Sequence, residues 1–347
     1  MYYGINFQAV KCACYQNRVN SEPPKNYISD SFKIFSENGL KYVRIPIYWE
    51  SYEIDQKEFN QELDTISNEA DRNNIFCIYD NHQWKCSSYL GYGIGFPNSL
   101  IKPYFDKDKE KLCSLDSPDL RNLKKFWDGW WNKKLITEDG REGWVAQLEY
   151  FKEVINKVKY KKSTFGFEIL NEPQVFRQKD FKMIAEYHDY FFKNLEQLTD
   201  KTLFFCYTSS GSLLNATNFP WQQVKIKPSI HINNKIVFDI HTYPPSCLFL
   251  IYYKILSKLL QNIPLIAGEY NSSIGKNTTI SFKRHKRYLD RLKRFSILGG
   301  LFWQWSYVKD NQHPSFNLTE TNGGKIYPND NFKNFIAAIS KNKINNK

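Results

Sequence analysis

The sequence lacks the closely spaced cysteines that mark zinc sites and disulfide scaffolds. It has seven cysteines among 347 residues, an odd number, with no CxxC pair and no Cys/His spacing typical of zinc. We therefore expect mostly reduced, structural thiols. A disulfide between Cys86 and Cys113 stays open, because both lie in one long stretch without a regular pattern.

Long hydrophobic runs are also absent. The longest, residues 247–256, is about half of what a membrane span needs, so none is expected. Residues 1–7 already have the pattern of a strand, so no signal peptide is visible. The compartment stays open between the cytoplasm and export as a trimmed mature chain. No linker or internal repeat divides the chain, which predicts one domain over residues 1–347.

Acidic residues are in the minority, and the formal net charge is +12. A basic chain can attract nucleic acid, and basic residues gather between Lys283 and Arg294. However, Tyr288, Leu289 and Leu292 interrupt them at helical spacing. This pattern predicts a helix with a solvated basic face and an apolar stripe. We therefore expect no nucleic-acid partner.

Short apolar runs alternate with helical patterns along most of the chain. Such alternation is typical of parallel βα units. The expected strands are residues 3–7, 41–46, 75–82, 164–170, 202–207, 236–243, 264–270 and 300–305. Eight strands with intervening helices predict an α/β fold in which the sheet closes into a (β/α)8 TIM barrel.

Residues 83–143 interrupt this alternation after the third strand. The stretch has no clear period but is rich in aromatic residues, which argues against disorder. We expect a long insertion that lines or covers a cleft at the barrel mouth, with short helical pieces such as one around residues 120–131. Trp127, Trp130 and Trp131 within it have two interpretations: a platform for sugar rings or core packing.

Polar residues gather where the predicted strands end, at the mouth where TIM barrels do their chemistry. Glu172 follows the fourth strand and Glu269 ends the seventh. Such carboxylates can face each other at about 5 Å, the spacing of a retaining glycosidase. Glu172 is then the general acid/base and Glu269 the nucleophile, which Arg44 helps to keep ionised.

Further mouth residues suit a sugar site. Asn171 is expected to contact the sugar 2-hydroxyl, and Trp303 to form a stacking floor in preference to Trp305. Tyr243 or Tyr270 is expected to hydrogen-bond the nucleophile. Each residue alone is more often structural, so the interpretation rests on their joint placement.

The chain resembles a cellulase-type glycoside hydrolase of family 5 over about residues 1–310. The resemblance is carried by Arg44 in Tyr-Val-Arg-Ile-Pro, His82, residues 168–173 (Glu-Ile-Leu-Asn-Glu-Pro), His241-Thr242-Tyr243, Gly268-Glu269-Tyr270 and Phe302-Trp303-Gln304-Trp305. It implies a TIM barrel and retaining hydrolysis of β-linked glycans, without metal or cofactor. The residues to which it assigns roles are Arg44, His82, Asn171, Glu172, His241, Tyr243, Glu269 and Trp303.

These features together predict an endo-β-1,4-glucanase that acts as a monomer on an oligo- or polysaccharide. Other substrates for the same site stay open: mannan, β-1,3-glucan, mixed-linkage glucan and glycolipid headgroups. A transglycosylase is a close variant. The competing class is a non-catalytic protein, either a carbohydrate-binding pseudo-enzyme or a basic surface protein, and the presence of both Glu172 and Glu269 argues against the former.

Overall fold

The computed structural model describes residues 1–12, 22–90, 92–105, 120–176, 180–206, 236–243, 246–259, 262–272, 279–310 and 313–344. Eight parallel strands close into a barrel in the order β1-β10-β9-β8-β7-β6-β3-β2. The barrel strands are β1 Tyr2–Phe7, β2 Tyr42–Ile47, β3 Phe76–Asn81, β6 Thr164–Glu168, β7 Thr202–Phe205, β8 Ile236–Thr242, β9 Leu265–Tyr270 and β10 Gly299–Trp305. The predicted TIM barrel is confirmed.

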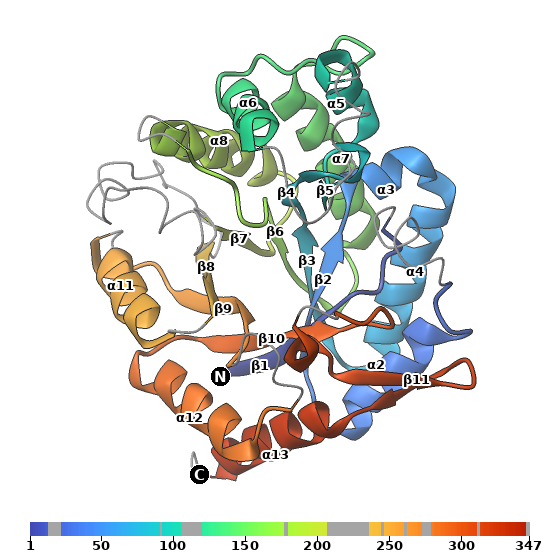
Figure 1. The fold of residues 1–347 in the computed structure, drawn as a ribbon, viewed down its shortest axis with the longest axis vertical. Coiled ribbons are helices and arrows are strands. Elements are labelled where there is room, and N and C mark those ends of the chain that lie inside the picture. The colour runs from blue at the N-terminus through green and yellow to red at the C-terminus, as the bar shows by residue number, and fades with distance from the viewer. Residues whose placement is uncertain are drawn as a thin grey trace.

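Helices surround the strands (Figure 1). They are α2 Tyr27–Glu37, α3 Trp49–Ile54, α4 Gln56–Asn73, α7 Gly143–Val158, α8 Asp180–Leu195, α11 Ser246–Leu259, α12 Phe282–Arg294 and α13 Asp330–Ile344. The basic helix α12 buries Tyr288, Leu289 and Leu292, as its spacing predicts. None of the helices in the described ranges combines the length and the hydropathy that a membrane-spanning helix requires.

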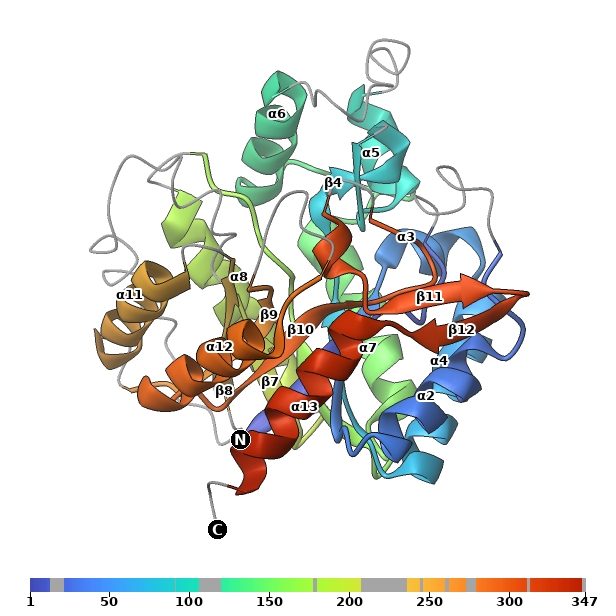
Figure 2. The same cartoon turned by 60° about the horizontal axis from the view of Figure 1, so that its bottom comes forward.

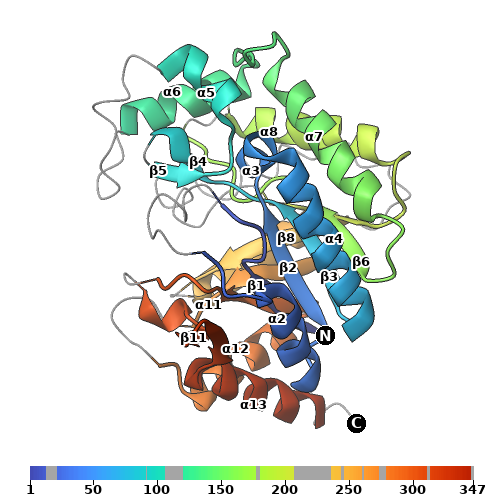
Figure 3. The same cartoon turned by 90° about the vertical axis from the view of Figure 1, so that its right-hand side faces the viewer.

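The insertion after β3 contains the helix predicted around residues 120–131, together with a hairpin and a further helix that the sequence did not predict. It contains the hairpin of β4 Trp84–Ser87 and β5 Tyr92–Ile94, a short 3-10 helix Ser88–Leu90, then α5 Asn98–Phe105 and α6 Leu120–Trp131. Figures 2 and 3 show these elements together at one end of the molecule, opposite the two termini. Because β4 directly follows β3, this end is the barrel mouth. Residues 91 and 106–119, which include Cys113, lie outside the described residues; Cys86 is a buried free thiol.

The tryptophans of α6 belong to the core of the insertion. Trp127, Trp130 and Trp131 are at most 1% exposed. Trp127 donates from Nε1 to the carbonyl of Lys85 (2.8 Å), and Trp131 donates to the carbonyl of Gln174 (2.9 Å). The platform interpretation is therefore wrong for these three residues. The hydrogen bonds of Trp127 and Trp131 connect α6 to the β4–β5 hairpin and to the loop that follows β6.

A second hairpin lies beside α13 (Figure 2) and was also not predicted. It pairs β11 Thr319–Asn322 with β12 Lys325–Pro328, and Gly323 and Gly324 between them both have positive φ. Two-residue hairpin turns of this kind require positive φ at both positions, which glycine adopts without strain.

Candidate active site

The structure brings the predicted site residues together at the C-terminal ends of the barrel strands. Glu269 lies on β9 and is directly opposite His241 of β8 in the strand pairing. The other six come from the ends of the neighbouring strands or from within the barrel: Arg44, His82, Asn171, Glu172, Tyr243 and Trp303. Parallel strands converge at one mouth, and this is why residues so far apart in the sequence meet.

Glu269 accepts hydrogen bonds from two different donors. Arg44 donates from Nη1 to Oε1 (2.9 Å), and the hydroxyl of Tyr243 donates to Oε2 (3.0 Å). Tyr270, the other tyrosine considered for this role, points away and stacks on Tyr288 with ring centroids 4.2 Å apart. A carboxylate that accepts from a guanidinium and from a hydroxyl is held in one orientation.

Glu172 is held from its backbone and from its carboxylate. Its φ of 37° lies in the left-handed region, which costs energy for any residue but glycine. Gln83 donates from Nε2 to the carbonyls of Asn171 and Glu172, each at 2.7 Å. Nδ1 of His241 lies 2.8 Å from Oε1 of Glu172. The Glu172 side chain is 12% exposed, so it can meet a ligand from the mouth.

His241 lies between the two glutamates. Its Nδ1 is 2.8 Å from Glu172 and 3.4 Å from Oε2 of Glu269. One oxygen of each carboxylate and one imidazole nitrogen all lie within 4.8 Å of one another. Burial lowers the pKa of His241, but the carboxylates of Glu269, Asp239 and Glu172 outweigh it and raise this pKa well above its usual value. The imidazole is therefore a cation between two acids.

His82 and Trp303 form one wall. Their rings stack with centroids 5.6 Å apart and an interplanar angle of 14°. Nδ1 of His82 lies 2.6 Å from Asp80, which fixes the ring. Trp303 is half-buried, whereas Trp305 is fully buried against Phe35. The expected choice of Trp303 over Trp305 as the floor of a sugar site is consistent with this exposure.

Below the mouth lies a layer of buried charges that the sequence reasoning missed. The Arg44 guanidinium contacts Asp80 (3.0 Å) and Glu168 (2.7 Å) and lies 3.7 Å from Asp239, in addition to Glu269. Burial raises the pKa of Glu168 to about 7, although Arg44 opposes the shift. Burial also raises the pKa of Asp80, again against Arg44. One guanidinium thus forms ion pairs with four carboxyl groups.

Asn171 is oriented by the same cation. Its Oδ1 accepts from Nη2 of Arg44 (2.7 Å), and its Nδ2 donates to the carbonyl of Gln83 (2.8 Å). The amide therefore has its oxygen occupied and keeps one N–H for another acceptor.

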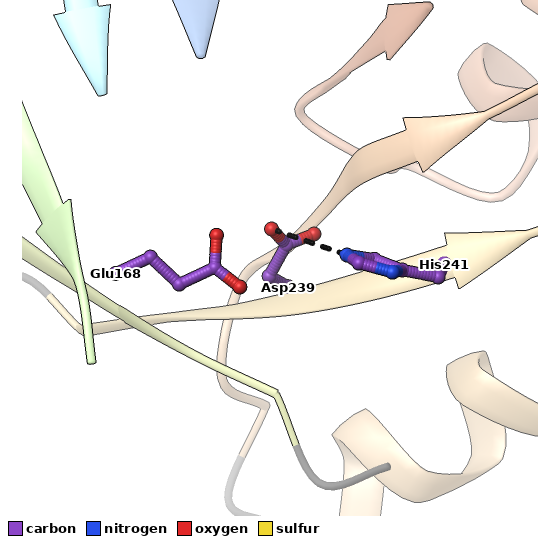
Figure 4. A group of neighbouring side chains, drawn as sticks. All are labelled: Glu168, Asp239 and His241. Carbon is purple, nitrogen blue, oxygen red and sulfur yellow. Dashed lines mark ion pairs between the residues drawn. The ribbon is translucent and has the colours of Figure 1, made fainter. Parts of the chain in front are cut away.

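Among the described residues, two groups of side chains have the composition of a metal site: Glu168, Asp239 and His241, shown in Figure 4, and Glu172, His241 and Glu269. In the first group, Nε of Arg44 is 2.7 Å from Glu168 and 3.7 Å from Asp239. A guanidinium beside these carboxylates supplies the positive charge and repels a second cation. The second group is better described as a pair of acids bridged by imidazolium.

A closed parallel barrel with two glutamates facing each other at its mouth is typical of barrel glycosidases. The family model "Cellulase (glycosyl hydrolase family 5)" matches residues 4–309. The chain therefore belongs to glycosyl hydrolase family 5 and is a glycoside hydrolase by family. A comparison with curated proteins gave no match.

Solved structures share the fold at low sequence identity. An endogalactoceramidase has a TM-score of 0.69 at 14% identity, covering 98% of this chain and 80% of that one. Endo-glycoceramidase II from Rhodococcus sp., as a lactosyl-enzyme intermediate, has a TM-score of 0.65 at 15% identity, with 90% and 74% covered. The Pseudomonas stutzeri endoglucanase Cel5A has a TM-score of 0.53 at 13% identity, with 87% and 85% covered.

Proposed function

We propose that this protein is a retaining β-glycosidase in which Glu269 is the nucleophile and Glu172 the general acid/base. The observation that carries the proposal is the spacing of the two carboxylates, whose nearest oxygens lie within 4.8 Å of each other. Retaining enzymes place their carboxyl groups about 5–5.5 Å apart, and inverting enzymes about 6.5–9.5 Å to admit a water. The close approach of the two carboxylates supports the retaining arrangement.

The contacts of each glutamate suit its role. Glu269, ionised by Arg44 and Tyr243, attacks the anomeric carbon while the carboxylic acid of Glu172 gives its proton to the departing glycosidic oxygen. An ester between the sugar and Glu269 results. Glu172, now ionised, takes a proton from water, whose oxygen attacks the anomeric carbon and breaks the ester. The sugar leaves with its original configuration.

The surrounding residues assist both steps. His241 donates to Glu172 in either protonation state of the acid and keeps it in place. The remaining N–H of Asn171 is available to the sugar 2-hydroxyl, a contact that strengthens in the transition state. Trp303, which is half-buried, provides an aromatic ring on which a sugar can stack.

Two variants test the roles. Glu269→Gln should abolish turnover and keep glycan binding, and it should gain no covalent mass from a 2-fluoro glycoside that labels the wild type. Glu172→Ala should lose about 10²–10⁴-fold on natural glycans but little on aryl glycosides with activated leaving groups, which need no proton. Asp64→Asn on the surface of α4 is the matched control. Near-normal activity of Glu269→Gln, or equal loss of Glu172→Ala on both substrate types, would refute the assignment.

Two substrate classes are supported by different observations. The family model supports a β-1,4-glucan as first substrate, as the sequence also suggested. A glycolipid headgroup is supported by α11, which starts directly beyond Tyr243 and exposes Ile251 and Ile255, each at 46%, one turn apart. The names of two structural relatives, endogalactoceramidase and endo-glycoceramidase, describe enzymes of such lipids.

A panel of substrates separates these classes. Reducing-sugar release should be measured on β-1,4-glucan, mannan, β-1,3-glucan and glycosylceramides in detergent, with Glu269→Gln as the blank. If the wild type releases sugar from glycosylceramides and the double variant Ile251→Ser/Ile255→Ser releases less, the substrate belongs to the glycolipid class. Release from soluble glucan alone assigns the glucanase. Salt-sensitive retention on DNA with no sugar released from any member would favour a basic binding protein instead.

A further inference from the structure

Asp239 is a buried carboxylate that the proposed chemistry does not use. It lies on β8, and its side chain is 2% exposed. Oδ1 accepts a hydrogen bond of 2.5 Å from the backbone N–H of Gly268. Oδ2 lies 3.9 Å from Nε2 of His241 and 3.7 Å from Nε of Arg44. Figure 4 shows the carboxylate between His241 and Glu168.

The contact between Asp239 and Gly268 is so close that it restricts position 268 to glycine. A Cβ at position 268 would lie 1.8 Å from Oδ2 of Asp239, so only glycine fits there. Gly268 immediately precedes Glu269, and His241 is paired with Glu269 across β8 and β9. Asp239 therefore holds the backbone beside one catalytic glutamate.

The contact with His241 acts on the other glutamate. Nε2 of this imidazole has no hydrogen-bond partner in the part of the chain that the structure describes, and the carboxylate of Asp239 faces it. The opposite nitrogen, Nδ1, bonds Glu172. A carboxylate behind an imidazole orients the ring and stabilises its charged form.

We propose that Asp239 is a positioning residue of the site, which holds Glu269 through the N–H of Gly268 and Glu172 through His241. The inference rests on the proposed retaining mechanism. One buried carboxylate thus fixes the relative placement of the nucleophile and the acid/base from below, without contact with substrate.

The charge of Asp239 is one of several that face His241. The others are Glu269 on β9, Glu168 at the end of β6 and Glu172 in the loop after it. Arg44 on β2 pairs with Glu168, Asp239 and Glu269, and the nearby Cys206 after β7 is a thiol whose pKa is raised by burial. Loss of a negative charge here favours proton release from every neighbouring acid, including the imidazolium. All titrations of the site then move to lower pH.

The test is Asp239→Asn, whose amide oxygen still accepts from Gly268 but carries no charge. The pH profile of kcat/KM should shift on both limbs to lower pH by at least about one unit, and kcat should fall more than KM rises. Asp64→Asn, which removes one carboxylate from the surface, should leave the profile in place. A lower rate at every pH without a shift would assign Asp239 a structural role only and overturn the proposal.

A second measurement does not depend on turnover. The side-chain NMR signal of His241, identified by its loss in His241→Asn, should report a protonated ring above pH 7 in the wild type and titrate at least about one unit lower in Asp239→Asn. An unchanged titration overturns the proposal. Should Asp239→Asn not fold, a wild-type His241 that deprotonates near its ordinary pKa of about 6.5 also overturns it. Absence of turnover in the wild type refutes the proposed function, yet leaves this measurement valid.

Discussion

Replacement of Arg44 by methionine tests the electrostatic description of the whole site. The guanidinium lies within 2.7–3.7 Å of Asp80, Glu168, Asp239 and Glu269, and none of these side chains is more than 6% exposed. Breaking a buried ion pair by removal of one partner costs about 3–5 kcal/mol. Because one cation serves four carboxyl groups, Arg44→Met should lower the free energy of unfolding at pH 7 by at least that amount. Typical domains have only about 5–15 kcal/mol in total.

The pH dependence of this loss has a definite sign. Without Arg44 the buried carboxyl groups bind protons in the folded protein at a pH where they are ionised in the unfolded chain. The folded state then holds more protons than the unfolded one, so stability rises as the pH falls. The difference between Arg44→Met and the wild type should therefore shrink from pH 7 towards about pH 4, where unfolded carboxyl groups also protonate.

Urea unfolding followed by tryptophan fluorescence at pH 7 and pH 5 measures both effects. Arg72→Met is the matched control, because Arg72 pairs with Glu69 on the surface of α4 at 71% exposure and should change stability by less than about 1 kcal/mol. Arg44→Lys keeps the charge without the planar fork and should fall between wild type and Arg44→Met. A loss below about 1 kcal/mol in Arg44→Met, or a loss independent of pH, would show that Arg44 does not compensate these carboxylates.

Two other predictions concern aromatic and histidine side chains. Trp84 lies on the hairpin that follows His82 and is 39% exposed. Trp84→Ala should therefore raise KM on long glycans more than on short ones, without a change in stability. An equal rise in KM for all chain lengths would contradict a subsite role. Trp127→Ala should instead cost about 3–5 kcal/mol of stability, since this ring is fully buried. Burial lowers the pKa of His285 to about 3. The wild type should therefore lose about 2 kcal/mol between pH 6.5 and pH 5 through this group, and His285→Leu should not; equal pH dependence of the two in urea unfolding would refute the reasoning.

The sequence predicted the barrel and the mouth residues because both follow from local patterns. Apolar runs mark buried parallel strands, and polar residues at their ends mark the mouth. The role of Trp127 could not be predicted in this way. Its burial depends on packing against Phe96 with ring centroids 5.6 Å apart and on Lys85, which are distant in the sequence. The β11–β12 hairpin, by contrast, carried a usable signal in the turn dipeptide Gly323-Gly324.

The buried charges also had a signal, although a weaker one. Side chains at i and i+2 of a strand point to the same face. Asp80 precedes His82 by this spacing, and Asp239 precedes His241. A histidine at the mouth therefore predicts that the carboxylate two residues earlier lies on the same face, one layer deeper in the barrel. The spacing alone could not show that both acids and Glu168 meet Arg44, since the distances across the barrel depend on how all eight strands close.

The buried layer explains why the two glutamates alone do not define the site. Arg44 donates hydrogen bonds to Glu269 and to Asn171, which precedes Glu172, and so orients both side chains. The glycine before Glu269 is required by Asp239, because any Cβ there would meet its carboxylate at 1.8 Å. A barrel with both glutamates but without Arg44 would have buried carboxylates left without their cation beside Glu269. Such a chain should bind sugars without hydrolysing them. The buried charged residues below the mouth therefore decide, together with the two glutamates, whether a barrel of this kind is an enzyme or a pseudo-enzyme.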